Sequence, residues 1–208
     1  MIVSLSLILF TVAVTPTFAD SSETVNLDIG GGTLEVSSST ANFSDIEINY
    51  AQKMYSTTSG TVTVNDSRAT GEGWVVTYAL SPFEATGIHD PTISSLNDKI
   101  SVRLLNTEVS LDIGNVVSLD GQDSTRVTRV SNTLNFFADN TPISILSAEL
   151  GGGMGVFSAT LGKTLYFENG VSEVTEVTGG SKLKVGDKLG ILKGTYTATI
   201  SLTAGSGL

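Results

Sequence analysis

Apolar and polar residues alternate with a period of two along much of the chain, and this periodicity limits the possible folds more than any other feature. In an extended strand successive side chains point to opposite faces, so one face becomes apolar. Alternation occurs at residues 24–29, 33–36, 61–64, 100–104, 109–113 and 196–202. This pattern and the richness in Gly, Thr, Ser and Val predict an all-β protein, a single-domain β-sandwich of mostly antiparallel strands. Residues 142–150 fit either a short helical turn or a strand.

Charge and cysteine content exclude several classes of function. The chain has no cysteine, so it can form neither disulfides nor a zinc–thiolate site. Its net charge of −10 would repel nucleic acid and anionic lipid, so neither is an expected partner. Stability must come from a hydrophobic core, and about 190 residues are enough to bury one.

Residues 1–19 have the properties of a secretory signal peptide. They contain no charged side chain, include an apolar run over residues 2–14, and end in Thr-Phe-Ala before Asp20. The apolar run is shorter than the ~20 residues that a membrane-spanning helix needs, and no later stretch is apolar enough. We therefore expect a secreted chain that begins at Asp20 and has no transmembrane segment.

The most distinctive stretch, residues 64–83, contains the only tryptophan. It reads as a hairpin: a strand, a polar loop with two glycines, and a second strand that Trp74 opens. Asp66 and Arg68 are two positions apart, so in an extended segment they share a face and can pair. Trp74 has two interpretations, a core residue or a platform on which a sugar ring stacks.

Other candidate sites lack the residues that their chemistry needs. His89 is the only histidine, and no Gly-x-Ser-x-Gly nucleophile elbow accompanies it, so we expect no catalytic triad and no enzyme. Asp120 and Asp123 could contribute to a calcium loop, but without the full acidic pattern an acidic turn is the simpler interpretation. The glycines at 30–32 precede a strand rather than a helix, which argues against phosphate binding. No cofactor or metal is expected.

Residues 66–83 resemble the proximal motif of the WxL domain, a surface module of Gram-positive bacteria. The family motif Asp-x-Arg-Gly-Thr-Gly-x-Gly-Trp-x-Leu is followed by a short strand that ends in Phe. The matching residues are Asp66, Arg68, Thr70, Gly71, Gly73, Trp74 and Phe83. Ala69 stands at a usual Gly, and Val76 at the Leu of Trp-x-Leu. The family's opening strands are matched by Val25, Gly32, Thr33, Leu34 and Phe43.

The C-terminus resembles the family's distal motif, Tyr-Thr-Ala-Thr-(Leu/Ile)-Thr-Trp-x-Leu. Residues 196–200 match its first five positions, while Leu202 occupies the Trp position and Ala204 the Leu position. The glycine-rich step at residues 153–155 also has a counterpart in the family. The resemblance covers nearly all of residues 20–208, which we take as one WxL-like domain, with the first and last strands close to the Trp74 hairpin.

The resemblance implies a non-catalytic protein of the cell surface that attaches non-covalently to peptidoglycan or another wall glycan. The expected glycan-binding residues are Trp74, Tyr78, Asp66, Arg68 and Tyr196. The two rings Trp74 and Tyr78 would contact sugars, while Asp66 and Arg68 would order the loop; structural roles remain open for all five. The alternative is a structural subunit of a fibre, pilus or surface layer, which would bind other surface proteins or copies of itself by β-strand addition. A secreted hydrolase has less support, because no nucleophile, base or metal cluster stands out.

Overall fold

The computed structural model describes residues 27–39, 42–50, 52–93, 97–130, 133–137 and 140–207. The predicted signal peptide lies outside these residues. The regular secondary structure of the described residues is almost entirely strand, and its single helical element is the short 3₁₀ helix η1 (Ser124–Arg126). Among the described residues no helix is long and apolar enough to span a membrane. The all-β prediction is confirmed.

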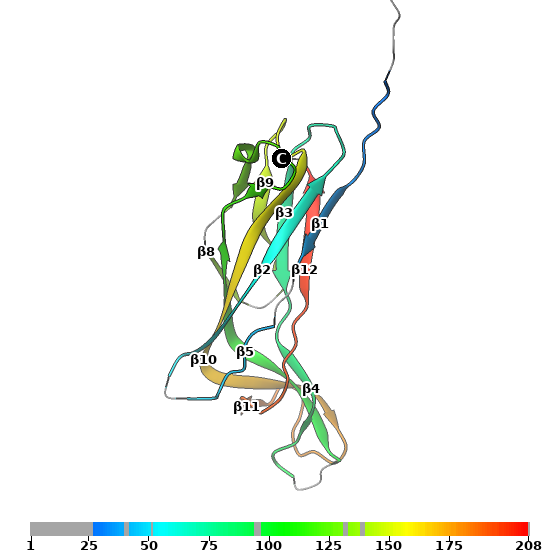
Figure 1. Cartoon of the computed structure of the whole chain (residues 1–208). Coiled ribbons are helices and arrows are strands. Elements are labelled where there is room, and N and C mark those ends of the chain that lie inside the picture. Colours follow the sequence, from blue (N-terminus) through cyan, green and yellow to red (C-terminus); the bar gives the residue numbers. More distant parts are fainter. Residues whose placement is uncertain are drawn as a thin grey trace, which may run out of the picture.

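Two antiparallel sheets pack face to face (Figure 1). The first sheet has eight strands, and its central order is β1, β2, β10, β5, β4, with β6, β8 and β11 paired at its margins. These strands are β1 (Leu34–Ser38), β2 (Met54–Asp66), β4 (Glu84–His89), β5 (Lys99–Ile113), β6 (Val117–Ser118), β8 (Thr133–Phe137), β10 (Gly155–Thr178) and β11 (Lys188–Gly190). The second sheet has the order β12, β3, β9, β7. Its strands are β3 (Trp74–Leu80), β7 (Val127–Arg129), β9 (Ile143–Ala148) and β12 (Ile200–Ser206). The ambiguous segment 142–150 is thus a strand.

The inner faces of the two sheets form the main hydrophobic core. Trp74, Val76 and Tyr78 alternate inward from β3, and they meet residues such as Val64 of β2 and Phe157 of β10. A smaller cluster consists of Ala85 of β4, Ile100 and Val102 of β5, and Val174 of β10. Strands β5 and β10 run through both clusters and join them (Figure 1).

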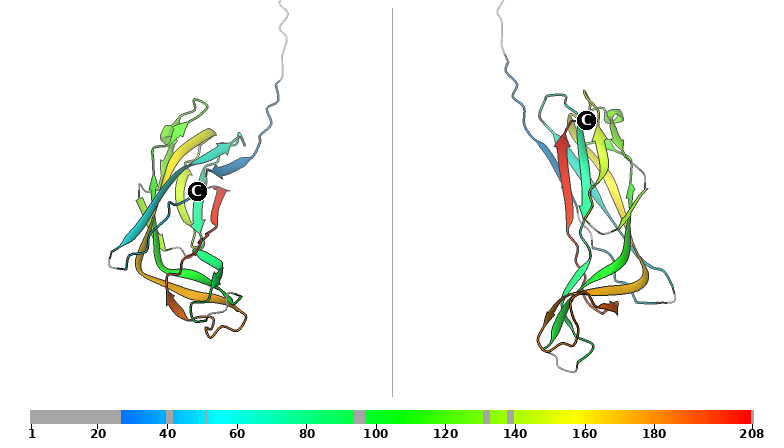
Figure 2. Two further views of the ribbon diagram at one scale, coloured as in Figure 1. Left: turned by 60° about the horizontal axis from the view of Figure 1, so that its bottom comes forward. Right: turned by 180° about the vertical axis from the view of Figure 1, so that it is seen from behind.

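The glycine-rich C-terminal third contains the longest strand of the described residues. Residues 155–178 form one strand, β10, which pairs with β2 over its first half and with β5 from Leu161 onwards. Register shifts follow Phe167 and Val174, and there the strand turns beneath the sandwich (Figures 1 and 2). Bulges of this kind let a long strand bend without ending.

The stretch around Trp74 is not a hairpin, which corrects the prediction. β2 and β3 belong to different sheets, so residues 67–73 cross from one sheet to the other. The predicted proximity of the first and last strands to this stretch is confirmed for the described residues, because Leu34 of β1 pairs with Asp66 and Ser206 of β12 pairs with Trp74. The strand expected at residues 24–29 is not formed over its described part, since residues 27–29 are exposed coil.

Candidate functional site

A salt bridge closes the crossing loop, as the spacing of its two residues predicted. Arg68 Nε donates to Asp66 Oδ1 at 2.8 Å and Arg68 Nη2 to Oδ2 at 2.9 Å, a bidentate pair. Asp66 is buried, and donating hydrogen bonds to its carboxylate raises the pKa of Arg68. Nη2 also donates to the backbone oxygen of Glu72 at 3.1 Å, so one guanidinium holds both ends of the loop.

Trp74 begins β3 directly after this loop and is a core residue. Its side chain is 0% exposed, and its ring packs against Phe157 with 6.5 Å between ring centroids. The indole Nε1 donates to the carbonyl oxygen of Gly153 at 3.0 Å. Neither this ring nor the equally buried ring of Tyr78 has a face that a sugar could reach. The stacking platform predicted from the sequence is therefore not formed by these two residues, because the second sheet turns both inward.

Backbone hydrogen bonds tie three segments together at this end of the sandwich. Gly151 N donates to Gly71 O at 2.7 Å, and Gly207 N donates to Gly73 O at 2.9 Å. We call the three segments, residues 67–73, 149–154 and 205–207, the Trp74 end; it lies beside the C-terminus in Figure 1. On its surface Leu150 is 80% exposed, and Met154 is also exposed. Sequence reasoning missed both residues, because an apolar side chain in a glycine-rich loop carries no periodic signal.

The distal motif positions face the core, not the solvent. Leu202 of β12 pairs with Tyr78 in register, and Ala204 pairs with Val76. Both side chains are partly buried against the main core. The position that the family reserves for a second tryptophan is thus a packing position in this chain.

Tyr196 lies away from the Trp74 end, beyond the opposite end of β12. Its ring is half-buried, and its hydroxyl donates to Leu192 O at 2.9 Å. Burial raises the pKa of this hydroxyl, although the hydrogen bond to Leu192 opposes the shift. The five predicted residues therefore do not form one site: Asp66, Arg68 and Trp74 meet around the crossing loop, Tyr78 is in the core, and Tyr196 is elsewhere.

Tyr196 lines an open groove of about 1040 Å³ between the two sheets. The groove floor is apolar and comes from both sheets, with Leu80 on one side and Leu104, Leu165 and Phe167 on the other. Residues 42–48 form one rim and residues 191–200 the other. The rims carry opposite charges, Asp45 on the first and Lys193 on the second. We call this feature the inter-sheet groove.

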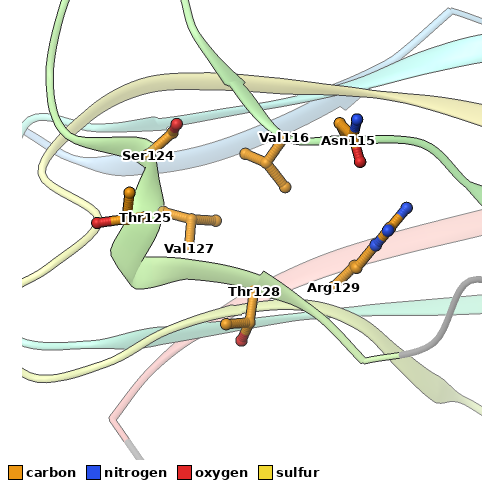
Figure 3. Close-up of a pocket in the computed structure, with 7 residues that line it drawn as sticks. All are labelled: Asn115, Val116, Ser124, Thr125, Val127, Thr128 and Arg129. Carbon is orange, nitrogen blue, oxygen red and sulfur yellow. The ribbon is translucent and has the colours of Figure 1, made fainter.

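A second pocket, of about 510 Å³, lies beside β7 and is shallow (Figure 3). Arg129 is the only charged side chain among its lining residues, and its Nη1 donates to Ile113 O at 2.9 Å. Val116 and Val127 line its middle, and the remaining residues are small and polar. The engaged guanidinium indicates a structural role for Arg129.

The acidic residues considered for metal or catalysis take part in turns. Asp120 accepts hydrogen bonds from Ser118 Oγ and Val156 N, and Asp123 caps η1 by accepting from Thr125 N. In the described ranges, no three His, Asp or Glu side chains lie close enough together to hold a metal ion. The carboxylate of Asp90, beside His89, accepts hydrogen bonds from Thr92 and Ser181.

The two-sheet fold and the closed crossing loop define an all-β sandwich domain that presents loops at one end. Comparison with known families gives a match over residues 23–204 to the family described as WxL domain, surface cell wall-binding. This match covers most of the chain, so the chain belongs to the WxL family, and its resemblance to the family motifs is confirmed. Neither the curated proteins nor the solved structures include a match to it.

Proposed function

We propose that this protein is secreted and attaches non-covalently to peptidoglycan, without catalysing a reaction, through the exposed loops of the Trp74 end. The family is a surface cell wall-binding one. We choose the exposed loops as the binding surface because the residues of the proximal motif have structural roles beneath them. Asp66, Arg68 and Trp74 hold the loops from below, and the loops themselves face solvent.

The chemistry of these loops suits a polymer of sugars and short peptides. Leu150 and Met154 offer exposed apolar surface for the C–H faces of sugar rings. The fixed positions of residues 71, 73 and 151 mean that little loop entropy is lost on binding. Rigid loops on a β scaffold are a frequent location of binding residues.

Sedimentation of the purified secreted chain with insoluble peptidoglycan tests this function. The protein should pellet with the wall material and be released by denaturant, as expected of a non-covalent complex. A chain that stays in the supernatant at all concentrations would refute wall binding.

A second function, assembly into a surface fibre by strand addition, is supported by a separate observation. Residues 27–31 leave the sandwich as an exposed, extended arm with apolar side chains at alternate positions (Figures 1 and 2). In the described chain this arm pairs with no strand. An unpaired segment with a strand pattern is the kind of element that adds to another sheet.

A further inference from the structure

The arm, residues 27–31, has the pattern of a β-strand but no partner in the described part of its own chain. Leu27 is 82% exposed and Ile29 80% exposed. In an extended segment these two side chains share one face, and Asp28 points to the other. Two large apolar side chains held in water at strand spacing favour burial against a second surface.

The root of the arm is fixed, which sets where the arm can reach. Gly32 N donates to Ser67 O at 2.8 Å, and Ser67 N donates to Thr33 O at 3.0 Å. At Gly31 an added Cβ would lie 2.1 Å from the backbone oxygen of Arg68, so the chain passes tightly against the crossing loop. The arm therefore leaves from the Trp74 end and runs away from the sandwich (Figure 2).

The inter-sheet groove lies toward the other end of the same molecule. Leu165 in its floor pairs with Ser56, which is ten positions along β2 from Asp66 at the root of the arm. Ten strand residues span roughly 33 Å, whereas the five residues of the arm reach at most about 18 Å. Leu27 and Ile29 therefore cannot fill the groove floor of their own molecule.

The groove matches an arm from another molecule in polarity and charge. Its floor is apolar, which suits Leu27 and Ile29, and rim residues 42–48 belong to no strand, so their backbone is not engaged in a sheet. With Leu27 and Ile29 on the floor, Asp28 points out of the groove mouth, where the long side chain of Lys193 on one rim is its complementary partner; the opposite rim carries Asp45.

We infer that the arm of one molecule inserts into the inter-sheet groove of a second copy, with Leu27 and Ile29 on the groove floor and Asp28 beside Lys193. The inference deepens the second proposed function and rests on it. Donor and acceptor lie at different ends of the molecule, so the contact is head-to-tail and repeats into an open chain of copies, not a closed dimer.

Site-specific disulfide formation tests the contact, since the chain has no cysteine of its own. Asp28→Cys protein is mixed with Lys193→Cys protein under mild oxidation, and the control mixture pairs Asp28→Cys with Val185→Cys. Val185 is 67% exposed in a turn outside the groove lining. We expect a mixed disulfide in the first mixture and not in the control. Equal yields in both mixtures, or none in the first, would overturn the inference.

Sedimentation velocity over a range of concentrations separates failure of the inference from failure of the assembly function. We expect concentration-dependent oligomers of the wild type and, for the double variant Leu27→Asp/Ile29→Asp, about a hundredfold weaker association or more. Both side chains are exposed in the single copy, so this variant should fold normally. If the double variant still forms oligomers, the assembly function is retained and the arm–groove contact is refuted. A wild type that stays monomeric at all concentrations refutes both.

Discussion

The indole Nε1 of Trp74 donates a hydrogen bond to the carbonyl oxygen of Gly153, 79 positions along the chain, across a distance of 3.0 Å. This contact joins the family motif to the glycine-rich loop that presents Leu150. Through it the buried tryptophan holds the loop that we propose as part of the wall-binding surface.

Replacement of Trp74 by alanine should destabilise the fold. Wall binding should be lost only to the extent that the protein unfolds. Deleting a fully buried aromatic side chain costs about 3–5 kcal/mol. Trp74→Phe should cost less, because it keeps a ring and loses mainly the hydrogen bond to Gly153, a loss of about 1–3 kcal/mol. Thermal unfolding measures both. A Trp74→Ala protein that keeps the wild-type midpoint yet no longer pellets with peptidoglycan would instead make the ring a binding platform.

Gly153 should tolerate no side chain. Its φ of 75° is left-handed, and an added Cβ would lie 2.5 Å from Trp74 Nε1 and 2.3 Å from Ala148 Cβ. Gly121 is the matched control, with φ of 83° and nothing within 4 Å of an added Cβ. Gly121→Ala should cost about 1–2 kcal/mol for backbone strain alone. Gly153→Ala should cost about 1–3 kcal/mol more, for overpacking against the ring. Urea unfolding measures both variants. Equal losses of unfolding free energy in Gly153→Ala and Gly121→Ala would contradict this packing.

Ala69→Gly should stabilise the protein. Ala69 has a φ of 58°, a region that L side chains occupy at a cost of about 1–2 kcal/mol. Glycine removes this strain but gives a more flexible unfolded chain, which offsets about 0.4–1 kcal/mol. We expect a net gain of up to about 1.6 kcal/mol in the free energy of unfolding. A destabilised variant would show that the left-handed conformation is not strained.

Lys163 should destabilise the fold at neutral pH. It is 3% exposed, it faces the sandwich interior between Leu161 and Leu165, and no carboxylate of the described residues pairs with it. Burial lowers the pKa of its ammonium group below the ordinary 10.5. Lys163→Met should raise the free energy of unfolding at pH 7 by about 1–3 kcal/mol, the usual cost of a buried polar group without a partner.

The advantage of Lys163→Met should shrink as the pH rises. Below the lowered pKa both folded and unfolded chains hold the proton and the burial penalty is complete. Between that pKa and 10.5 the unfolded chain binds more protons, so wild-type stability increases with pH. Urea unfolding of both proteins at pH 7 and pH 9.5 measures the difference, in which the shared effects of the buried tyrosines cancel. A difference that does not change with pH would contradict an unpaired, buried amine.

Local sequence features were sufficient to predict many of the strands and the salt bridge, although the strand expected at residues 24–29 is not formed over its described part. Period-two alternation depends only on which face of a strand is buried. The inward set Tyr196, Ala198, Ile200 and Leu202 could therefore be read directly, although β12 begins only at Ile200. A spacing of two positions in an extended segment likewise places Asp66 and Arg68 on the same side, where they pair. Both predictions concern neighbours in the chain, for which geometry is nearly fixed.

Features that depend on distant segments could not be predicted. Whether residues 67–73 form a hairpin or cross between sheets depends on whether β3 pairs with β2 or with β9 and β12, and loop composition does not decide this. The burial of Trp74 depends on Gly153, and the inter-sheet groove depends on rims that are about 150 residues apart in sequence. Glycine is disfavoured in strands, so the glycines within β10 locally favour breaks, and pairing with β2 and β5 overcomes that preference.

The central claim is that the exposed loops of the Trp74 end, and not the buried rings, contact the wall. Leu150→Asp and Val185→Asp test it most directly, because both replace an exposed apolar side chain by a charge, one at the Trp74 end and one at a distant turn. Both variants should keep the wild-type stability within about 0.5 kcal/mol. In sedimentation with insoluble peptidoglycan, we predict that Leu150→Asp binds at least about tenfold more weakly than wild type and that Val185→Asp binds equally well. Full binding by a correctly folded Leu150→Asp protein would contradict the claim.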